Sequence, residues 1–105
     1  FNMGIQEDAG ELLVYVYREY QKGEMVNSQN FEESSGWDKI RTRNAMTYLR
    51  DKELVKGNFY LGGNWLIQRP NPEGVDVIEN QSKFVQKFGF ELNLGLFKFS
   101  WETIE

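Results

Sequence analysis

The sequence predicts an α+β domain with four helices, a β-hairpin after the third helix and a further β-hairpin at the C-terminus. Three observations support this. Apolar residues recur at helical spacing over 8–22 and over 38–52. Two β-prone runs flank Gly62-Gly63, which is typical of a hairpin turn. Apolar and polar residues then alternate within 86–105. We therefore expect a main domain over 8–85 and a C-terminal hairpin tail over 86–105.

The composition limits the chemistry that the chain can perform. A length of 105 residues favours a single domain, and eight Phe, five Tyr and three Trp provide for a packed core. The sequence has no Cys and no His, so disulfides, thiolate chemistry and the commonest general base are missing. No phosphate-binding glycine loop and no nucleophile beside a base is present. We expect a cytoplasmic protein that is not an enzyme, has no cofactor or metal and does not cross a membrane.

The charge of the chain is unevenly distributed. The formal net charge is −4. Between positions 38 and 69, seven basic and three acidic residues give a local charge of +4, and the remainder, with five basic and thirteen acidic residues, carries −8. Because local charge decides how a protein meets a phosphate backbone, the segment 38–69 is the candidate for binding an anionic partner.

The first half of the chain predicts three helices. A helix over 8–22 ends at Gly23, where a left-handed conformation is least costly for glycine. A short second helix begins near Ser28, with Ser28 or Asn27 as its cap, and the longest helix follows over 38–52. Such a helix, turn and helix is a common nucleic-acid-binding arrangement.

The helix over 38–52 is amphipathic, and Asp38 is its predicted N-cap. At about 100° per residue, one half of the helix gathers residues that we expect to face the core. These are Ile40, Asn44, Ala45, Tyr48 and Leu49. The opposite arc gathers residues that we expect to face solvent. These are Lys39, Arg43, Met46 and Arg50.

Two further side chains near this helix have predicted partners. Arg41 lies toward the buried side, so we expect it to extend past the core to an acidic residue such as Glu32 or Glu33. Trp37 is expected to pack the turn against the core, since exposure for recognition is the less common role of a Trp at this position.

The hairpin after the long helix is predicted to turn at its two glycines. If Gly62 and Gly63 are the only loop residues, Leu61 faces Asn64, Tyr60 faces Trp65 and Phe59 faces Leu66. The tip of this hairpin is uncharged.

The region after the hairpin predicts one more helix and the tail. Asn71 caps a helix with Pro72 in its first position, and this helix continues to about Ser82 or Phe84. In the tail, a turn at Leu94-Gly95 places six apolar side chains on one face. These are Phe88, Phe90, Leu92, Phe97, Phe99 and Trp101. This face needs a cover, either the core of its own chain or a second subunit, and we expect a homodimer with these residues at its interface.

Two segments carry a resemblance to a known family. The run from Ile40 through Tyr48–Val55 and the run Asn71–Glu79 resemble the winged helix-turn-helix superfamily, as in MarR-like and PadR-like bacterial regulators. The second run looks like the segment T-P-E-G-I-D-L-I-E, which often follows the wing in bacterial winged-helix proteins of unassigned function. The resemblance covers about 11–80 and implies a small bacterial transcriptional regulator. It implies DNA contacts by position at Lys39, Thr42, Arg43, Met46, Thr47 and Arg50. The basic wing of the family is not reproduced.

Two functions of different classes follow. One is sequence-specific binding of double-stranded DNA, with the helix 38–52 in the major groove. The other is a winged-helix module that binds protein and has lost its DNA contacts. The cationic arc favours the first, and the acidic total charge with the neutral wing favours the second.

Overall fold

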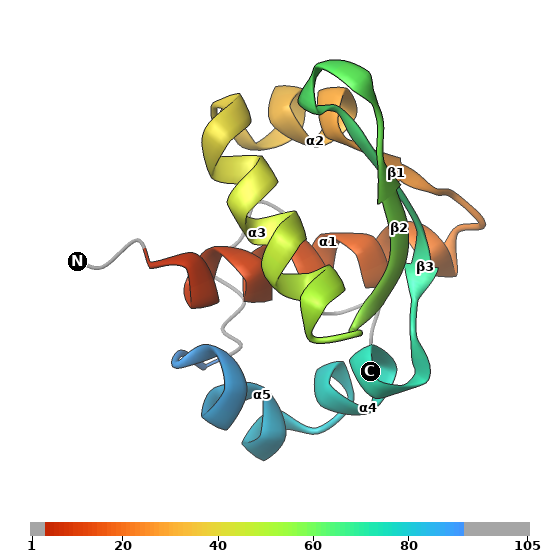
Figure 1. The fold of residues 1–105 in the computed structure, drawn as a ribbon. Coiled ribbons are helices and arrows are strands. Elements are labelled where there is room, and N and C mark those ends of the chain that lie inside the picture. Colours follow the sequence, from red (N-terminus) through yellow and green to blue (C-terminus); the bar gives the residue numbers. More distant parts are fainter. Residues whose placement is uncertain (1–3, 92–105) are drawn as a thin grey trace.

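A computed structural model describes residues 4–91 and shows an α+β fold with five α-helices and a small antiparallel sheet. The elements in chain order are α1 (Ile5–Gln21), β1 (Val26–Asn27), α2 (Ser28–Ser35), α3 (Lys39–Asp51), β2 (Val55–Phe59), the 3-10 turn η1 (Leu61–Gly63), β3 (Trp65–Pro70), α4 (Pro72–Ile78) and α5 (Gln81–Phe88). The three strands lie in the order β1-β3-β2 (Figure 1). The mixed α+β class predicted from the sequence is confirmed.

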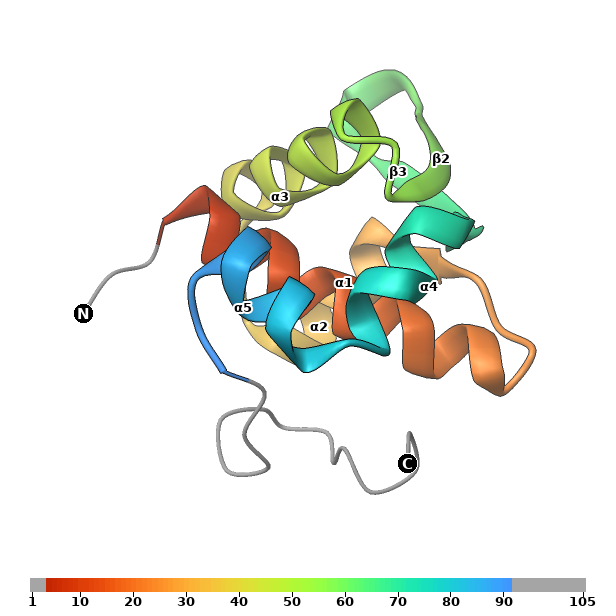
Figure 2. The same cartoon turned by 90° about the horizontal axis from the view of Figure 1, so that it is seen from below.

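Helix α1 is the element around which the others pack. Its residues Leu12, Leu13 and Val16 are buried in the core, as the helical spacing predicts. In Figure 1 this helix runs through the centre of the molecule, with α2 above it, α4 and α5 below it and the sheet to one side. Figure 2 shows α3 and the hairpin of β2 and β3 along one side of α1, with α4 and α5 over another. Helix α3 therefore has one face on α1 and another directed away from it.

The ends of the first three helices follow the predicted capping chemistry. Gly23 follows α1 with a φ of 84°, so the predicted C-terminal glycine is confirmed. The Asn27 side chain accepts a hydrogen bond from the backbone N–H of Asn30 at 2.8 Å and caps α2. Gly36 ends α2 in the left-handed conformation, and Asp38 caps α3 through the backbone N–H of Arg41 at 2.8 Å. These caps fix the turn that sets the start of α3.

The register of the β2–β3 hairpin differs from the prediction by one residue. Phe59 pairs with Trp65, and the backbone N–H of Tyr60 donates to the Asn64 carbonyl at 2.7 Å, so the loop has three residues, Leu61–Gly63. Predicted pairings such as Tyr60 with Trp65 were wrong. A one-residue slip reverses the face of a side chain, and this register puts Trp65 in the core while Tyr60 stays exposed.

The helix predicted after the hairpin is two helices, which makes five in residues 4–91 where the sequence predicted four. Helix α4 ends at Ile78, and α5 begins anew because the Asn80 side chain caps it, accepting from the Lys83 backbone N–H at 3.1 Å. Helix α5 runs to Phe88 and so crosses the predicted boundary between 85 and 86.

The start of the predicted tail packs inside its own chain. Phe88 is helical and buried, so its predicted place in a β-hairpin and at a subunit interface was wrong. Phe90 is partly buried, with its ring 5.2 Å from that of Phe84. A Cβ on Gly10 would stand 2.8 Å from the Phe88 ring, so α5 approaches α1 closely only because glycine is there. The predicted interface residues Leu92, Phe97, Phe99 and Trp101, and the rest of the tail, lie outside the described residues.

Candidate functional site

The outward face of α3 is the most cationic helix surface in the described part of the chain. Its exposed side chains include Lys39, Ile40, Arg43, Asn44 and Arg50, and Thr47 is partly exposed. The three cations are among the contacts predicted from the sequence. Lys56 on β2 is also exposed and extends the basic character onto the hairpin.

Two of the predicted contact residues are in the core instead. Thr42 and Met46 are fully buried, so neither is available to a ligand, and their assignment to the binding face was wrong. The buried Thr42 hydroxyl has two acceptors within hydrogen-bond distance, a Glu32 carboxylate oxygen at 2.8 Å and the Lys39 carbonyl at 3.0 Å. It therefore has a hydrogen-bond partner although water does not reach it. Met46 packs under Gly57, where a Cβ would meet the Met46 methyl at 2.9 Å.

The inward face of α3 is therefore rotated from the predicted one. Thr42, Ala45, Met46 and Leu49 are its buried residues. Ile40, predicted to face the core, is 64% exposed, and Asn44 is exposed as well. The helical wheel places Ile40 and Asn44 on the inward half, but both lie on the surface because Thr42 and Met46 occupy the core side of α3 instead.

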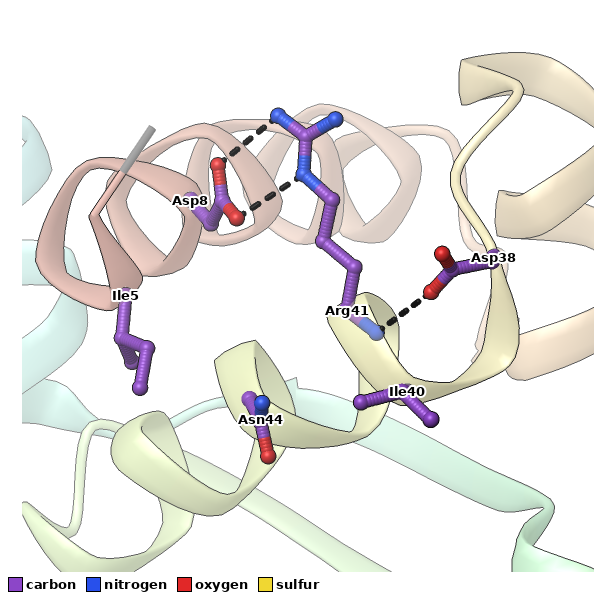
Figure 3. Close-up of a pocket in the computed structure, with 6 residues that line it drawn as sticks. All are labelled: Ile5, Asp8, Asp38, Ile40, Arg41 and Asn44. Carbon is purple, nitrogen blue, oxygen red and sulfur yellow. Dashed lines mark hydrogen bonds and ion pairs between the residues drawn. The ribbon is translucent and has the colours of Figure 1, made fainter. Parts of the chain in front are cut away.

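Arg41 serves the fold and is not part of the outward face. Its guanidinium donates two hydrogen bonds to the carboxylate of Asp8, both at 2.9 Å (Figure 3). It also lies 4.0 Å from the Trp37 ring. The hydrogen bond to Asp8 raises the pKa of Arg41, and partial burial opposes that rise. The predicted acidic partner of Arg41 is confirmed, but it is Asp8 and not Glu32 or Glu33. The predicted packing of Trp37 in the core is confirmed as well.

Neighbouring groups hold two of the outward cations in place. The Lys39 ammonium donates to the Asn64 side-chain oxygen at 2.7 Å, which joins the start of α3 to the hairpin. The Arg50 guanidinium lies 5.0 Å from the Phe59 ring and 3.9 Å from the carboxylate of Asp51. In residues 4–91, Arg43 forms no ion pair with a carboxylate, so its charge is directed to solvent.

A shallow depression lies between the starts of α1 and α3. Its volume is about 290 Å³. Figure 3 shows its lining, which is Ile5, Asp8, Asp38, Ile40, Arg41 and Asn44. Asp8 binds Arg41, and Asp38 caps the helix, so the charged groups in this depression already bind one another. We assign no ligand to it.

A metal site and a membrane-spanning helix are two further features by which a function could be recognised in residues 4–91. Within 4–91, no group of three or more acidic side chains is placed to hold a metal ion. In the same residues, no helix has the length and apolar character needed to span a bilayer. Comparison with known proteins gives no matching family model, no matching curated protein and no matching solved structure.

Proposed function

We propose that this chain is a winged helix-turn-helix protein and that α3 is its recognition helix. The order of its elements supports this: α2 and α3 are separated by a three-residue turn, and the β2–β3 hairpin follows α3 in the position of a wing. The strand order β1-β3-β2, with β1 preceding α2, is compatible with the same arrangement.

The proposed function is sequence-specific binding of double-stranded DNA, as a small, homodimeric, cytoplasmic bacterial transcriptional regulator. The observation that carries it is the outward face of α3, where Lys39, Arg43 and Arg50 are all exposed while Arg41 is held by Asp8. A helix of 13 residues is about 20 Å long and has the diameter that a major groove admits.

Each residue on this face has a distinct proposed role. Arg43, near the middle of the face, suits a bidentate contact to guanine, and its neighbour Asn44 suits one to adenine. Lys39 and Arg50, near the two ends of the helix, suit the phosphates that flank the groove. In a homodimer, two copies of α3 would enter the groove about one helical turn apart.

The second candidate function is a protein-binding module. The observation in its favour is the exposed, uncharged tip of the hairpin, where Tyr60 is 55% exposed and Leu61 is 96% exposed. The acidic remainder of the chain, which would repel DNA at long range, also favours it.

One experiment separates the two. Binding of the full chain to a random-sequence duplex is measured by fluorescence anisotropy at several salt concentrations, for the wild type and for Arg43→Ala/Arg50→Ala. If both arginines contact phosphate, the slope of log K against log salt becomes shallower by about 1.8, at roughly 0.9 per phosphate. If Arg43 contacts bases instead, the slope changes by about half of that.

The matched control is Lys22→Ala/Lys83→Ala, which removes the same charge from exposed positions at the end of α1 and in α5. We expect its slope to equal that of the wild type. Failure of the wild type to bind the duplex at low salt, or an equal slope change in the control, would refute the DNA-binding proposal and leave the protein-binding module.

A further inference from the structure

The tip of the β2–β3 hairpin presents an apolar projection. Leu61 is 96% exposed, the highest exposure among the large apolar side chains of the described residues, and the adjacent Tyr60 is 55% exposed. A single exposed leucine on a protein surface is ordinary. This one stands at the end of a hairpin, beside an aromatic residue, and contributes almost nothing to the core.

The tip is held in place by hydrogen bonds on both sides. The three-residue loop is closed by the backbone N–H of Tyr60 on the Asn64 carbonyl at 2.7 Å. The Asn64 side-chain oxygen lies 3.3 Å from the Ser28 hydroxyl of α2 and accepts from the Lys39 ammonium at 2.7 Å. The exposed apolar side chain is therefore carried on a loop whose base is anchored to two helices.

The position of the tip relative to α3 suggests what it meets. Gly63 lies beside the start of α3, because a Cβ there would be 3.8 Å from Cδ of Lys39. With α3 in the major groove, Lys39 would stand at the phosphate backbone that bounds that groove. The tip, next to Lys39, would then lie at that backbone and within reach of the adjacent minor groove, which is about 6 Å wide.

We propose that Leu61 is a wedge that enters the minor groove, inserts between two base pairs and bends the duplex, an inference that rests on the proposed DNA binding. Apolar side chains such as leucine unstack base steps in this way and kink DNA by roughly 20–90°. Pyrimidine–purine steps are the most easily unstacked, so the preferred ligand is duplex DNA with such a step beside the α3 site. The neutral tip, which lacks the cations that would hold phosphates, suits insertion between bases.

The test uses the full chain and a duplex of 30 base pairs, about the length of three helical turns, with a central TA step. A donor and an acceptor label its two ends, and 2-aminopurine next to the TA step reports unstacking. Anisotropy of the same duplex reports binding. We expect the wild type to raise both the energy transfer and the 2-aminopurine fluorescence.

Leu61→Ala is the decisive variant, because its side chain packs against almost nothing and its loss leaves the fold intact, as thermal unfolding checks. We expect it to bind with an unchanged salt slope, since no phosphate contact is lost, and to lose both signals of bending. Leu61→Met keeps an apolar side chain that can insert between base pairs, so we expect this variant to retain both signals of bending. Met25→Ala, at an apolar residue that is 58% exposed on the approach to β1, is the control and is expected to bend DNA as the wild type does.

Each outcome decides the proposal. Bending that persists in Leu61→Ala, or binding of the wild type without bending, overturns the wedge and leaves DNA binding intact. No binding of the wild type to the duplex at low salt overturns the wedge together with the proposed function.

Discussion

Breaking the ion pair between Asp8 and Arg41 is expected to destabilise the fold more than any exposed charge change would. The pair joins α1 to α3 through two charge-assisted hydrogen bonds of 2.9 Å. The Asp8 side chain is 7% exposed and that of Arg41 is 30% exposed. Removal of Arg41 therefore leaves a buried charge without a partner, whereas removal of Asp8 leaves a charge that water can reach.

The structure sets the order of the two single variants. Arg41→Met keeps an aliphatic stem over Trp37 and leaves the Asp8 carboxylate buried without its charged partner, a situation that costs about 3–5 kcal/mol. Asp8→Ala leaves a guanidinium that water still reaches, so we expect a smaller cost of about 2 kcal/mol, near that of lost hydrogen bonds to a charged group. The double variant should lose less than the sum of the two, by at least about 1.5 kcal/mol.

The assay is urea unfolding followed by circular dichroism, with the four members of the cycle compared at one pH and one ionic strength. The matched control is the exposed pair of Lys22 and Glu19, which are 3.1 Å apart with side-chain exposures of 60% and 23%. Its cycle, Lys22→Met and Glu19→Gln, is expected to give a coupling below about 0.5 kcal/mol. A coupling between Asp8 and Arg41 no larger than that of the control would refute the reasoning.

Three further predictions test the packing and one titration. Met46→Ala should lower the unfolding free energy by about 2–5 kcal/mol because the residue is fully buried. Ile40→Ala, at a side chain that is 64% exposed, should change it by less than about 0.5 kcal/mol. Equal effects of the two substitutions would contradict the observed inward face of α3. Gly74→Ala should lower stability by about 1–3 kcal/mol in the same assay, since its Cβ would stand 2.3 Å from the backbone oxygen of Leu54, and a neutral effect would show that the helix can shift. Burial, with a hydrogen bond to the Glu79 carboxylate, raises the pKa of Tyr17 from 10.0 to about 12. The neutral phenol therefore contributes its full share of the unfolding free energy below pH 10, and this share is lost as the pH rises toward 12. Tyr17→Phe should remove this loss from a pH series of unfolding midpoints, and a wild-type curve that is flat across that window would contradict the assignment.

Local signals in the sequence were sufficient to place the helices of the first half. Asp38 and Gly23 carry cap chemistry that acts over a few residues, and the structure uses both as expected. The break between α4 and α5 had a comparable signal in Asn80, a preferred N-cap residue. It was missed because apolar residues continue at helical spacing across it, and periodicity alone does not show that a helix stops and restarts.

Partners far apart in the sequence could not be predicted in the same way. Arg41 is 33 positions from Asp8, and nothing in the local pattern distinguishes Asp8 from Glu32 or Glu33 as its partner. The hairpin register failed for a related reason. Two glycines permit a two-residue or a three-residue loop, and the observed loop pairs the buried Trp65 with Phe59, which packs against the core, and leaves Tyr60 exposed.

The inward face of α3 is a further feature that the sequence did not predict correctly, and it determines which residues lie in the candidate site. The predicted and observed inward faces differ by about 100°, the angle of one residue, because the buried position of Thr42 depends on acceptors that the helix wheel does not include. Lys39, Arg43 and Arg50 remain exposed, although Met46, which shares their arc of the wheel, is buried. The rotation replaces Thr42 and Met46 on the surface with Ile40 and Asn44.

The proposal of DNA binding therefore depends on how the structure divides four cations of one helix, and not on the net charge of the chain. Arg41 is bound to a buried carboxylate and stabilises the contact of α3 with α1. The other three face solvent, and only Arg50 has a carboxylate within 4 Å in residues 4–91, at 3.9 Å. The Lys39 ammonium joins the start of α3 to the hairpin through a 2.7 Å hydrogen bond to the Asn64 side chain. That bond orders a flexible side chain at an entropic cost and keeps the cation of Lys39 beside the base of the hairpin loop.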